Sequence, residues 1–166
     1  MDVLKIGDYT FKPVGVDGVY ICDCVVFKAE FDKNFCNDWE KSSGKKLLEK
    51  WFKRHAPAEI QEQFDIDLPT VKEVFSQEML NLYHDGRKLT SRQFPIFKDL
   101  DERMKKFDGK RAWWWTRSTH AGYPNHAWSV NFDGVIYASY ACSVGGFVPV
   151  LRKLKKRLML PAVISK

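Results

Sequence analysis

The pair Asp133-Gly134, set between two β-prone runs, is the feature that most constrains the fold of this chain. The runs, 127–132 and 135–140, are rich in β-branched and aromatic residues. An Asp-Gly pair in this setting is typical of a type I′ turn, because both central residues of that turn take positive φ. The sequence therefore predicts an antiparallel hairpin over 127–140.

A buried strand is predicted just before this hairpin. Residues 113–117, WWWTR, form a near-continuous apolar run of the kind found in strands that are covered on both faces. Side chains alternate along a strand, so Trp114 is expected to point away from the tryptophans on either side of it. We expect Trp114 and Trp128 in the core, with Arg117 as a buried or half-buried partner in an ion pair or a ring stack.

A last strand is predicted after the hairpin. Gly145-Gly146 is expected to break the chain, and residues 147–151, FVPVL, then have the composition of a strand. Pro149 has no backbone N–H to donate, so this strand is expected to lie at a sheet edge or to carry a bulge.

The earlier part of the chain carries both strand and helix signals. Residues 9–12 and 19–27 are predicted strands joined through the turn signal Asp17-Gly18. Thr70 and Glu73 have the spacing of a capping box at a helix start. The predicted helices cover 44–55, 57–64, 70–83 and 97–108, the last ending at Asp108-Gly109. The predicted fold class is therefore α+β, with a small, twisted, mostly antiparallel sheet and flanking helices.

The first predicted helix has a start signal and one apolar face. Ser42 or Ser43 can act as its N-cap, and Pro57 follows its expected end. The apolar stripe is expected to consist of Leu47, Leu48, Trp51 and Phe52.

Length and composition favour one folded domain. The chain has 166 residues, of which 45% are hydrophobic, and is most simply a single domain over 1–153 followed by a tail, 154–166. The sequence shows no signal-like start and no apolar run long enough to span a bilayer, so a cytoplasmic location without a membrane partner is expected. The tail is basic and then apolar. We expect it to dock on the domain or on a second copy of the chain, which leaves monomer and homodimer open.

Three motifs, in this order, resemble the C-terminal signature of a bacterial and phage domain family of unknown function. The signature reads W-W-L-R-S, then V-N-x-D-G, then G-V-R-P-A-L. The matching residues are Trp114, Trp115, Arg117, Ser118, Val130, Asn131, Asp133, Gly134, Gly146, Phe147, Pro149 and Val150. Residues 39–43, WEKSS, also resemble the W-E-N-S-S of the family, whereas Val148 stands where the family usually has Arg.

This resemblance implies a fold and limits the chemistry. The family is similar to formylglycine-generating-enzyme-like and C-type-lectin-like domains, so a C-type-lectin-like fold is expected, in the cytoplasm or in a phage particle. Enzymes of the wider fold use two neighbouring cysteines near the C-terminus for copper-dependent chemistry. This chain has only Cys142 in that region, so the resemblance does not imply that activity here.

The leading functional prediction is non-enzymatic binding of a protein or a glycan. The loop and hairpin near the C-terminus are rich in Tyr, Ser, Asn and His, the residue types that binding surfaces favour. In lectin-like folds of this type the equivalent region often forms the ligand face. The predicted ligand-binding residues are Tyr123, Asn125, His126, Tyr137, Ser139, Tyr140 and Ser143. The loop lacks the carboxylate and amide set of a calcium-dependent sugar site, and no cofactor is predicted.

A basic module that binds nucleic acid or an acidic protein surface is the alternative, for example a phage-encoded inhibitor of a host system. The net charge is +6, and the cations are clustered in two segments. Such clusters favour anionic partners, although they also serve as solvated surface. The candidate anion-binding residues are Lys45, Lys46, Lys50, Lys53, Arg54, Arg152, Lys153, Lys155, Lys156 and Arg157.

An enzymatic function would depend on Cys142 with His120 and His126 as nucleophile and base. The same histidines with Asp133 have no spacing typical of a metal site. Neither arrangement is favoured, so no catalytic residue and no metal ligand is predicted.

The other cysteines are predicted to be structural. Cys22 and Cys24 are two apart in a strand pattern, share a face and pair poorly as a disulfide, so buried thiols are expected. A disulfide between Cys36 and Cys142 stays open at this level.

Overall fold

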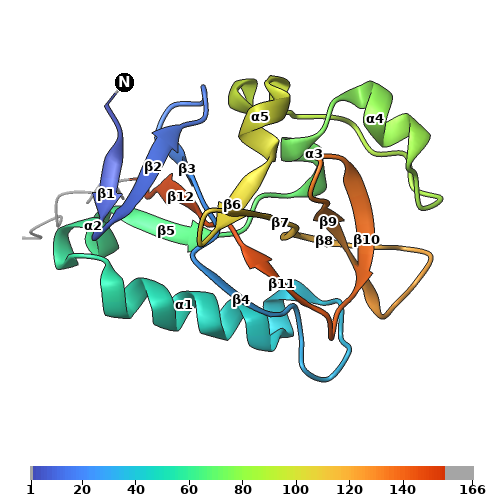
Figure 1. Cartoon of the computed structure of the whole chain (residues 1–166), viewed down its shortest axis with the longest axis horizontal. Helices are drawn as coiled ribbons and strands as arrows, with labels where there is room; N and C mark the ends of the chain where they lie inside the picture. The colour runs from blue at the N-terminus through green and yellow to red at the C-terminus, as the bar shows by residue number, and fades with distance from the viewer. Residues whose placement is uncertain (1, 156–166) are drawn as a thin grey trace, which may run out of the picture.

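The computed structural model describes residues 2–155 and shows a mixed α+β fold with two curled five-stranded sheets (Figure 1). The strand order of the first sheet is β1 (Leu4–Ile6), β2 (Tyr9–Pro13), β3 (Val19–Cys22), β12 (Val150–Lys153) and β5 (Phe64–Asp67). The order of the second is β10 (Ile136–Tyr140), β9 (His126–Val130), β8 (Trp114–Thr119), β11 (Val144–Phe147) and β4 (Phe27–Glu30). The pairs are antiparallel except for β8 with β11. The predicted α+β class with mostly antiparallel strands is confirmed, whereas the single small sheet that was predicted is replaced by two five-stranded sheets.

The helices are short apart from one. They are α1 (Ser43–His55), α2 (Ala58–Gln63), α3 (Val71–Val74), α4 (Gln77–Leu82) and α5 (Leu100–Arg103), with 3₁₀ turns at Trp39–Lys41 and Pro95–Lys98. A two-stranded hairpin, β6 (Lys105–Phe107) with β7 (Lys110–Ala112), completes the described elements. In Figure 1, α1 runs along the lower side of the molecule, and it contacts both β4 and β5. None of the helices in residues 2–155 is long and apolar enough to cross a membrane.

The chain passes from one sheet to the other at Pro149, which corrects the prediction of a single last strand over 147–151. β11 ends at Phe147 in the second sheet, and β12 begins at Val150 in the middle of the first, so neither strand is an edge. Pro149 lies in the link, where its missing N–H breaks no ladder and its carbonyl accepts from the N–H of Cys22 at 2.9 Å. The proline therefore marks a sheet switch. The predicted strand 19–27 divides in the same way, into β3 and β4.

The two glycines Gly145-Gly146 lie inside β11, so the predicted chain break at this point is wrong. A Cβ on Gly145 would lie 2.5 Å from the ring of Trp113, and one on Gly146 would lie 2.7 Å from Val25. These distances are too short for carbon atoms. The glycines are needed because neighbouring groups approach the strand closely, which is a known role of glycine in a strand.

The hairpin over 127–140 is confirmed, but its turn differs from the predicted type I′. Of the two turn residues only Gly134 has positive φ, at 73°. Its N–H donates to the carbonyl of Asn131 at 3.1 Å, and the N–H of Asn131 donates to the carbonyl of Val135 at 2.9 Å. This is a type I turn followed by a left-handed glycine. The side chain of Asn131 stabilises the longer loop, because its Oδ1 accepts from the N–H groups of Asp133 and Val135.

The type I′ geometry occurs instead at Asp108-Gly109, where a helix end was predicted. Both residues have positive φ, 49° and 75°, and they join β6 to β7 in a two-residue turn. The predicted helix 97–108 is therefore wrong: the 3₁₀ turn at Pro95–Lys98 and the single turn of α5 precede β6. Apolar spacing alone did not separate these short turns from one amphipathic helix.

The predicted helix starts at Ser42 and Thr70 are confirmed, and one predicted helix is broken in two. Ser42 caps α1 by accepting from the N–H of Lys45, and Thr70 forms the predicted capping box with Glu73. The helix predicted over 70–83 stops after α3, where extended Phe75 is fully buried, and Ser76 caps α4 as a new start. Of the predicted stripe on α1, Leu47 is 42% exposed and does not belong to the core.

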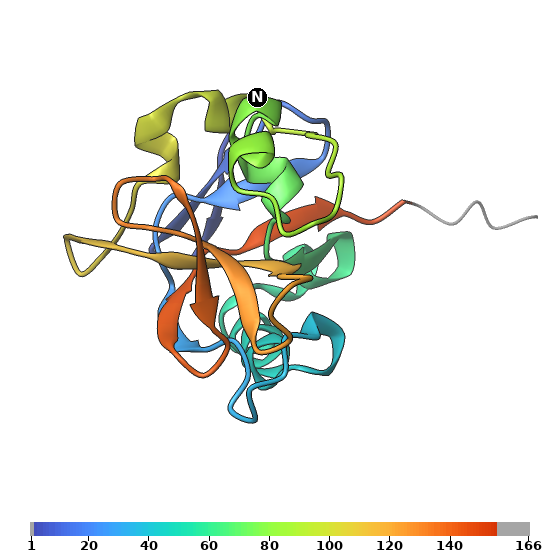
Figure 2. The same ribbon diagram turned by 90° about the vertical axis from the view of Figure 1, so that its right-hand side faces the viewer.

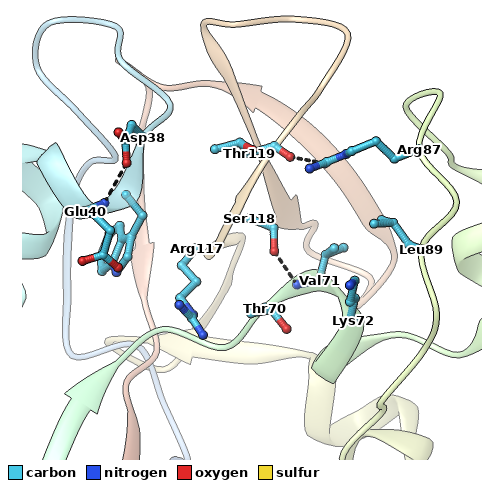
Figure 3. A pocket seen from close by; sticks show the side chains of 11 residues that line it. Asp38, Glu40, Thr70, Val71, Lys72, Arg87, Leu89, Arg117, Ser118 and Thr119 are labelled. Carbon is cyan, nitrogen blue, oxygen red and sulfur yellow. Dashed lines mark hydrogen bonds between the residues drawn. The ribbon is translucent and has the colours of Figure 1, made fainter.

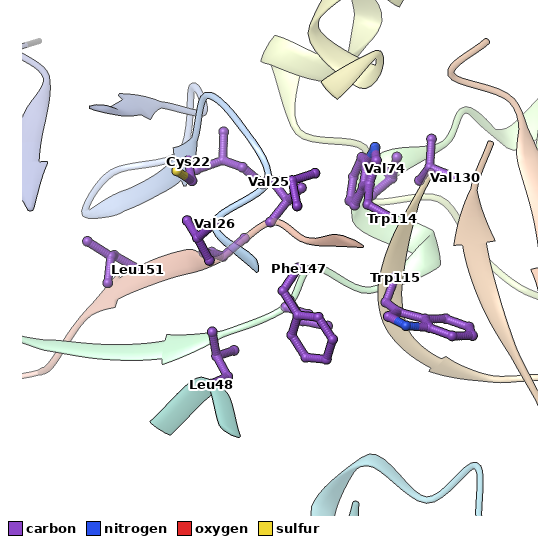
Figure 4. Close-up of a cluster of buried hydrophobic side chains, with 14 of the residues drawn as sticks. Cys22, Val25, Val26, Leu48, Val74, Trp114, Trp115, Val130, Phe147 and Leu151 are labelled. Atoms are coloured by element: carbon purple, nitrogen blue, oxygen red, sulfur yellow. The ribbon is translucent and has the colours of Figure 1, made fainter. Parts of the chain in front are cut away.

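The core is built around Trp114 and Trp115, the first two residues of β8, which point to opposite sides of the strand (Figure 4). Trp114 is fully buried; its ring stacks on Phe97 at 6.0 Å, and its Nε1 donates to the carbonyl of Arg103 at 2.9 Å. Trp115 is also fully buried and packs edge-on against Phe31 at 5.4 Å. The expected burial of Trp114 and Trp128 is confirmed.

All four cysteines are free thiols. β3 ends at Cys22, so the expectation that Cys22 and Cys24 occupy one strand is wrong, although the two side chains still meet. The hydrogen bond with Cys22 lowers the pKa of the Cys24 thiol to about 7. Cys36 and Cys142 are both half-buried and unpaired.

Candidate functional site

The predicted ligand-binding residues divide between the two faces of the β9–β10 hairpin, which faces the viewer in Figure 2. In an antiparallel pair, residues directly opposite one another point to the same side. Tyr137 is paired with Ser129 and therefore lies on one face, whereas Tyr140 is paired with His126 and lies on the other. Ser139 shares the face of Tyr137. The sequence thus identified residues of two different surfaces.

The first face carries an open pocket with a volume of ≈ 370 Å³, which we call the hairpin pocket. It is lined by Trp113, Ser129, Asn131, Phe132, Tyr137 and Ser139. Three of these side chains are aromatic and three are small and polar. None of them is charged. Tyr137 is 60% exposed and Phe132 is 52% exposed, so aromatic surface is available to a ligand.

Backbone geometry and packing hold the aromatic side chains of the hairpin pocket in place. Trp113 contacts Trp115 edge-on, with ring centroids 4.8 Å apart, and Gly145 leaves room for its ring. Phe132 is held in the turn that the side chain of Asn131 stabilises. The hydroxyl groups of buried Ser129 and of Ser139 are hydrogen bonded at 3.0 Å. The pocket is therefore largely formed before any ligand arrives.

The second face carries a row of contacting rings, which we call the ring row. It runs from buried Trp128 through His120, Tyr123 and His126 to Tyr140. The successive centroid distances are 4.5, 4.9, 5.1 and 4.1 Å. Its outer members are exposed, with Tyr123 at 58% and Tyr140 at 54%. The rings support one another but line none of the pockets described for this protein.

Other predicted residues near the ring row have local structural roles. Asn125 accepts at its carbonyl from the N–H of Ala141 at 2.8 Å, and its side chain lies 2.9 Å from Nδ1 of His126. Ser143 donates its N–H to the carbonyl of Tyr140 in the turn after β10. Asn37, from the loop after β4, donates to the carbonyl of His126 at 3.0 Å. The bonds of Asn125 and Asn37 fix the shape of the β8–β9 loop.

The carboxylate of Asp85 anchors the inner end of the ring row. It accepts from Nε1 of Trp128 at 3.2 Å, from the N–H of Ala121 at 2.8 Å and from the guanidinium of Arg87. Its side chain is fully buried. Burial acts to raise the pKa of Asp85, but the hydrogen bonds from Arg87 and Ala121 outweigh it and hold the pKa well below its usual range.

Replacing Asp85 is expected to remove a pH-dependent part of the stability. The folded-state pKa is depressed, so the contribution is complete above the unfolded-state value of about 4 and is lost as the pH falls through the folded-state value. Asp85→Asn should lower the free energy of unfolding at neutral pH by about 1–3 kcal/mol. Urea titrations at about pH 7, 5 and 3 should then show a shallower acid loss for the variant than for the wild type. Parallel acid losses would contradict this role.

The two predicted basic clusters meet at a wide groove of ≈ 640 Å³ between α1 and β12. Lys45 and Lys53 from α1 and Arg152 from β12 line it, together with Glu49, Asp65, Asp67 and others. Lys50 and Arg54 instead line a smaller cavity beside Trp51. Lys46, Lys153 and Lys155 are exposed, while Lys156 and Arg157 lie outside the described residues.

Ion pairs neutralise much of the charge in this groove. Lys45 pairs with Glu40, and Arg152 pairs with Glu73 at 2.8 Å. The exposed Lys45–Glu40 pair is weak and can be replaced by a bound anion, whereas the Arg152–Glu73 pair is partly buried. The groove therefore presents cations from both predicted clusters, but its acidic lining opposes an anionic ligand.

Arg117 lies between this groove and a neighbouring pocket of ≈ 380 Å³ (Figure 3). Its Nε is 3.6 Å from a carboxylate oxygen of Asp67, so the predicted half-buried ion pair is confirmed. Next to it, the hydroxyl of Ser118 accepts from the N–H of Val71 at 2.9 Å and ties α3 to β8. These matches to the W-W-L-R-S motif have structural contacts.

The arrangement expected of a cysteine nucleophile is not formed in residues 2–155. Nδ1 of His120 accepts from the N–H of Gly122 at 3.0 Å, and His126 contacts Asn125, so neither ring is hydrogen bonded to Cys142 in this part of the chain. Burial lowers the pKa of His120. In the same residues no group of three or more His, Cys, Asp or Glu side chains is placed to hold a metal ion.

Sequence reasoning missed four of the six residues of the hairpin pocket. The sequence pattern indicates Trp113 only as a neighbour of the buried Trp114, and it places Ser129, Asn131 and Phe132 in a strand and its turn. Ser129 is paired with Tyr137, so the two side chains point to the same side of the hairpin. The alternation of side chains along the predicted strands could therefore have identified Ser129. The position of Phe132 depends on the turn type, which the sequence did not predict.

Comparison with known families gives one match. A family described as a domain of unknown function (DUF6273) matches residues 64–156, which is more than half of the chain. The matched part runs from β5 to β12 and includes all six residues of the hairpin pocket. No curated protein and no solved structure matches the chain.

Proposed function

The chain belongs to the DUF6273 family, whose domains have unknown function, and we propose that it is a non-enzymatic binding protein that recognises a protein or a glycan through the hairpin pocket. The observation that carries this proposal is the pocket itself, in which exposed aromatic side chains surround small polar groups. Aromatic anchors with adaptable polar neighbours are the composition of binding surfaces. The proposal narrows the predicted surface to the face of Tyr137 and Ser139.

The finer fold assignment is also a proposal. We infer a C-type-lectin-like fold, related to that of formylglycine-generating-enzyme-like domains, from the resemblance of the tryptophan, Asp-Gly and Gly-Phe-Val-Pro motifs. The curled antiparallel sheets and the strand crossing at Pro149 support it. A bacterial or phage origin follows from the same resemblance. An experimental structure whose strand order differs from that of lectin-like domains would contradict the assignment.

Two tyrosines of β10 give a matched test of the binding face. Tyr137 and Tyr140 are on the same strand, on opposite faces, and are 60% and 54% exposed. Tyr137→Ala is expected to abolish capture of the partner, whereas Tyr140→Ala should leave it nearly unchanged. Both should alter the free energy of unfolding by no more than about 0.5 kcal/mol, because surface substitutions rarely do more. Tyr140 also contacts His126, so the free energy of unfolding of the Tyr140→Ala variant is the one to measure first.

The experiment is a pull-down from a lysate of the native host with the immobilised protein, compared across wild type, Tyr137→Ala, Tyr140→Ala and the triple variant that adds Tyr123→Ala. Mass spectrometry and glycan staining identify what is captured. Loss in Tyr140→Ala with retention in Tyr137→Ala would move the site to the ring row. Equal capture by every variant would overturn the proposal.

A basic module is the second candidate function, and the convergence of both clusters on one groove favours it. Lys45, Lys53 and Arg152 come from distant parts of the sequence and line the same groove. Binding of nucleic acid there should weaken steeply as salt increases, because counterions are released from the phosphates. Gel-shift titrations at two salt concentrations test this, with Lys53→Ala and Arg152→Ala as variants. No shift at the lower salt concentration would end this candidate.

A further inference from the structure

We propose that the ligand group held in the hairpin pocket is a neutral pyranose sugar ring. This inference rests on the proposed function and names the ligand class for the same site. It follows from three properties of the pocket: its lack of charge, its exposed aromatic faces and its unused hydrogen-bonding groups.

The lining of the hairpin pocket excludes recognition by ion pairing. Its six residues include no Lys, Arg, His, Asp or Glu, although the whole chain has a net charge of +6. An anionic group would find no countercharge among these side chains. A neutral ligand is the one that this pocket suits.

The aromatic side chains supply a surface for the apolar face of a sugar. Trp113, Phe132 and Tyr137 all line the pocket. The face of an aromatic ring carries the negative part of its quadrupole, which attracts the slightly positive C–H groups on one side of a pyranose. Trp113 is fixed edge-on to buried Trp115, so little side-chain entropy is lost when a ring packs on it.

The polar side chains supply the complementary hydrogen bonds. Both donors on Nδ2 of Asn131 are available, because only its Oδ1 is bonded within the described residues. These backbone contacts also fix which way the amide points. The hydroxyl groups of Ser129 and Ser139 bond to each other. Ser129 is buried, so the half-buried Ser139 is the one whose remaining hydrogen-bonding capacity faces a ligand. Sugar hydroxyl groups both donate and accept hydrogen bonds, so they can pair with the donors and acceptors of these side chains.

The size of the pocket fits one ring of a longer glycan. Its volume of ≈ 370 Å³ lies at the lower end of the range for small-ligand sites, about 300–1,000 Å³. Phe132 and Tyr137 form the exposed rim of the pocket, so the remaining sugar rings of a longer glycan would lie in solvent. A single ring in so open a site is expected to bind with a dissociation constant of about 1 mM.

The test is a titration of the whole protein with neutral sugars: glucose, galactose, mannose and N-acetylglucosamine, with glucuronic acid as the charged control. Tryptophan fluorescence and ¹H–¹⁵N spectra report binding. At least one neutral sugar is expected to shift the indole signal of Trp113, while glucuronic acid binds at least about tenfold more weakly. Tyr137→Ala should weaken the neutral sugar at least about tenfold, and Tyr140→Ala should leave it unchanged.

Asn131→Asp gives a second variant that keeps the turn. The carboxylate retains an acceptor for the N–H groups of Asp133 and Val135 but removes the Nδ2 donors. Sugar binding should weaken at least about tenfold while the melting temperature stays close to that of the wild type. If the turn is disturbed, Tyr137→Ala still decides the question.

The outcomes separate this inference from the proposed function. If no neutral sugar binds but partner capture still depends on Tyr137, the sugar inference is overturned and the binding function stands. If a sugar binds equally well to Tyr137→Ala, its site is elsewhere and the inference is also overturned. If neither sugar binding nor capture depends on Tyr137, both are wrong.

Discussion

Trp114→Ala is expected to lower the free energy of unfolding by about 3–5 kcal/mol, the usual cost of removing a large buried aromatic side chain. Trp114 is fully buried and stacks on Phe97. Its Nε1 also donates to the carbonyl of Arg103, which the substitution would leave without this partner. Losses of this size are a large fraction of the total stability of a typical domain, so the variant is expected to be partly unfolded at 37 °C.

Urea denaturation followed by fluorescence measures this effect, and Trp113→Ala is the matched control. Trp113 precedes Trp114 in the chain but is half-buried and lines the hairpin pocket. Its replacement should cost less than half as much. Equal losses for the two variants would contradict the assignment of Trp114 to the core and Trp113 to the site.

Gly44→Ala is the second substitution with a large expected effect, and its sign is unusual. In a helix interior, alanine is normally more favourable than glycine by about 1 kcal/mol. Gly44 lies in the first turn of α1, where a Cβ would be 2.5 Å from the carbonyl oxygen of Phe31 and 2.9 Å from the ring of Phe147. The backbone oxygen cannot move aside without shifting β4 or α1. We therefore expect a loss of about 1–3 kcal/mol.

The control for Gly44→Ala is Lys46→Ala on the exposed side of the same helix. It should change the free energy of unfolding by less than about 0.5 kcal/mol. Thermal unfolding of both variants gives the comparison. A stabilised Gly44→Ala variant would show that α1 packs less closely on β4 than described.

Local signals in the sequence predicted the elements whose causes are local. Ser42 and Thr70 cap helices with their own side chains, and the hairpin over 127–140 follows from strand composition around a glycine turn. These features need no knowledge of the rest of the chain. The α+β class and the burial of Trp114 could be predicted for the same reason.

Features that depend on distant contacts could not be predicted. Gly145-Gly146 looked like a break, because the sequence does not show that Trp113 and Val25 approach this strand. Pro149 suggested an edge, because the sheet switch appears only when both sheets are known. The two Asp-Gly pairs, at 108–109 and 133–134, have the same sequence but form different turns. The side chain of Asn131 helps to account for the difference.

The candidate site was predicted only in part for a similar reason. The composition of residues 123–143 indicated a binding surface, but the division of Tyr137 and Tyr140 between two faces required the register of β9 with β10. The contribution of Trp113 required the neighbouring strand β8. When a site is formed by several strands, the sequence can indicate its separate segments but not how they come together.

The most direct test of the central claim, that the hairpin pocket is the binding site, is a ¹H–¹⁵N footprint of the captured partner on the labelled protein. The indole signals of the six tryptophans serve as reporters. We predict that the partner shifts the Trp113 indole and the backbone amides of Phe132 and Tyr137, while the Trp51 indole on α1 stays unchanged. Shifts confined to α1 and β12, with Trp113 unaffected, would contradict the claim and favour the basic groove.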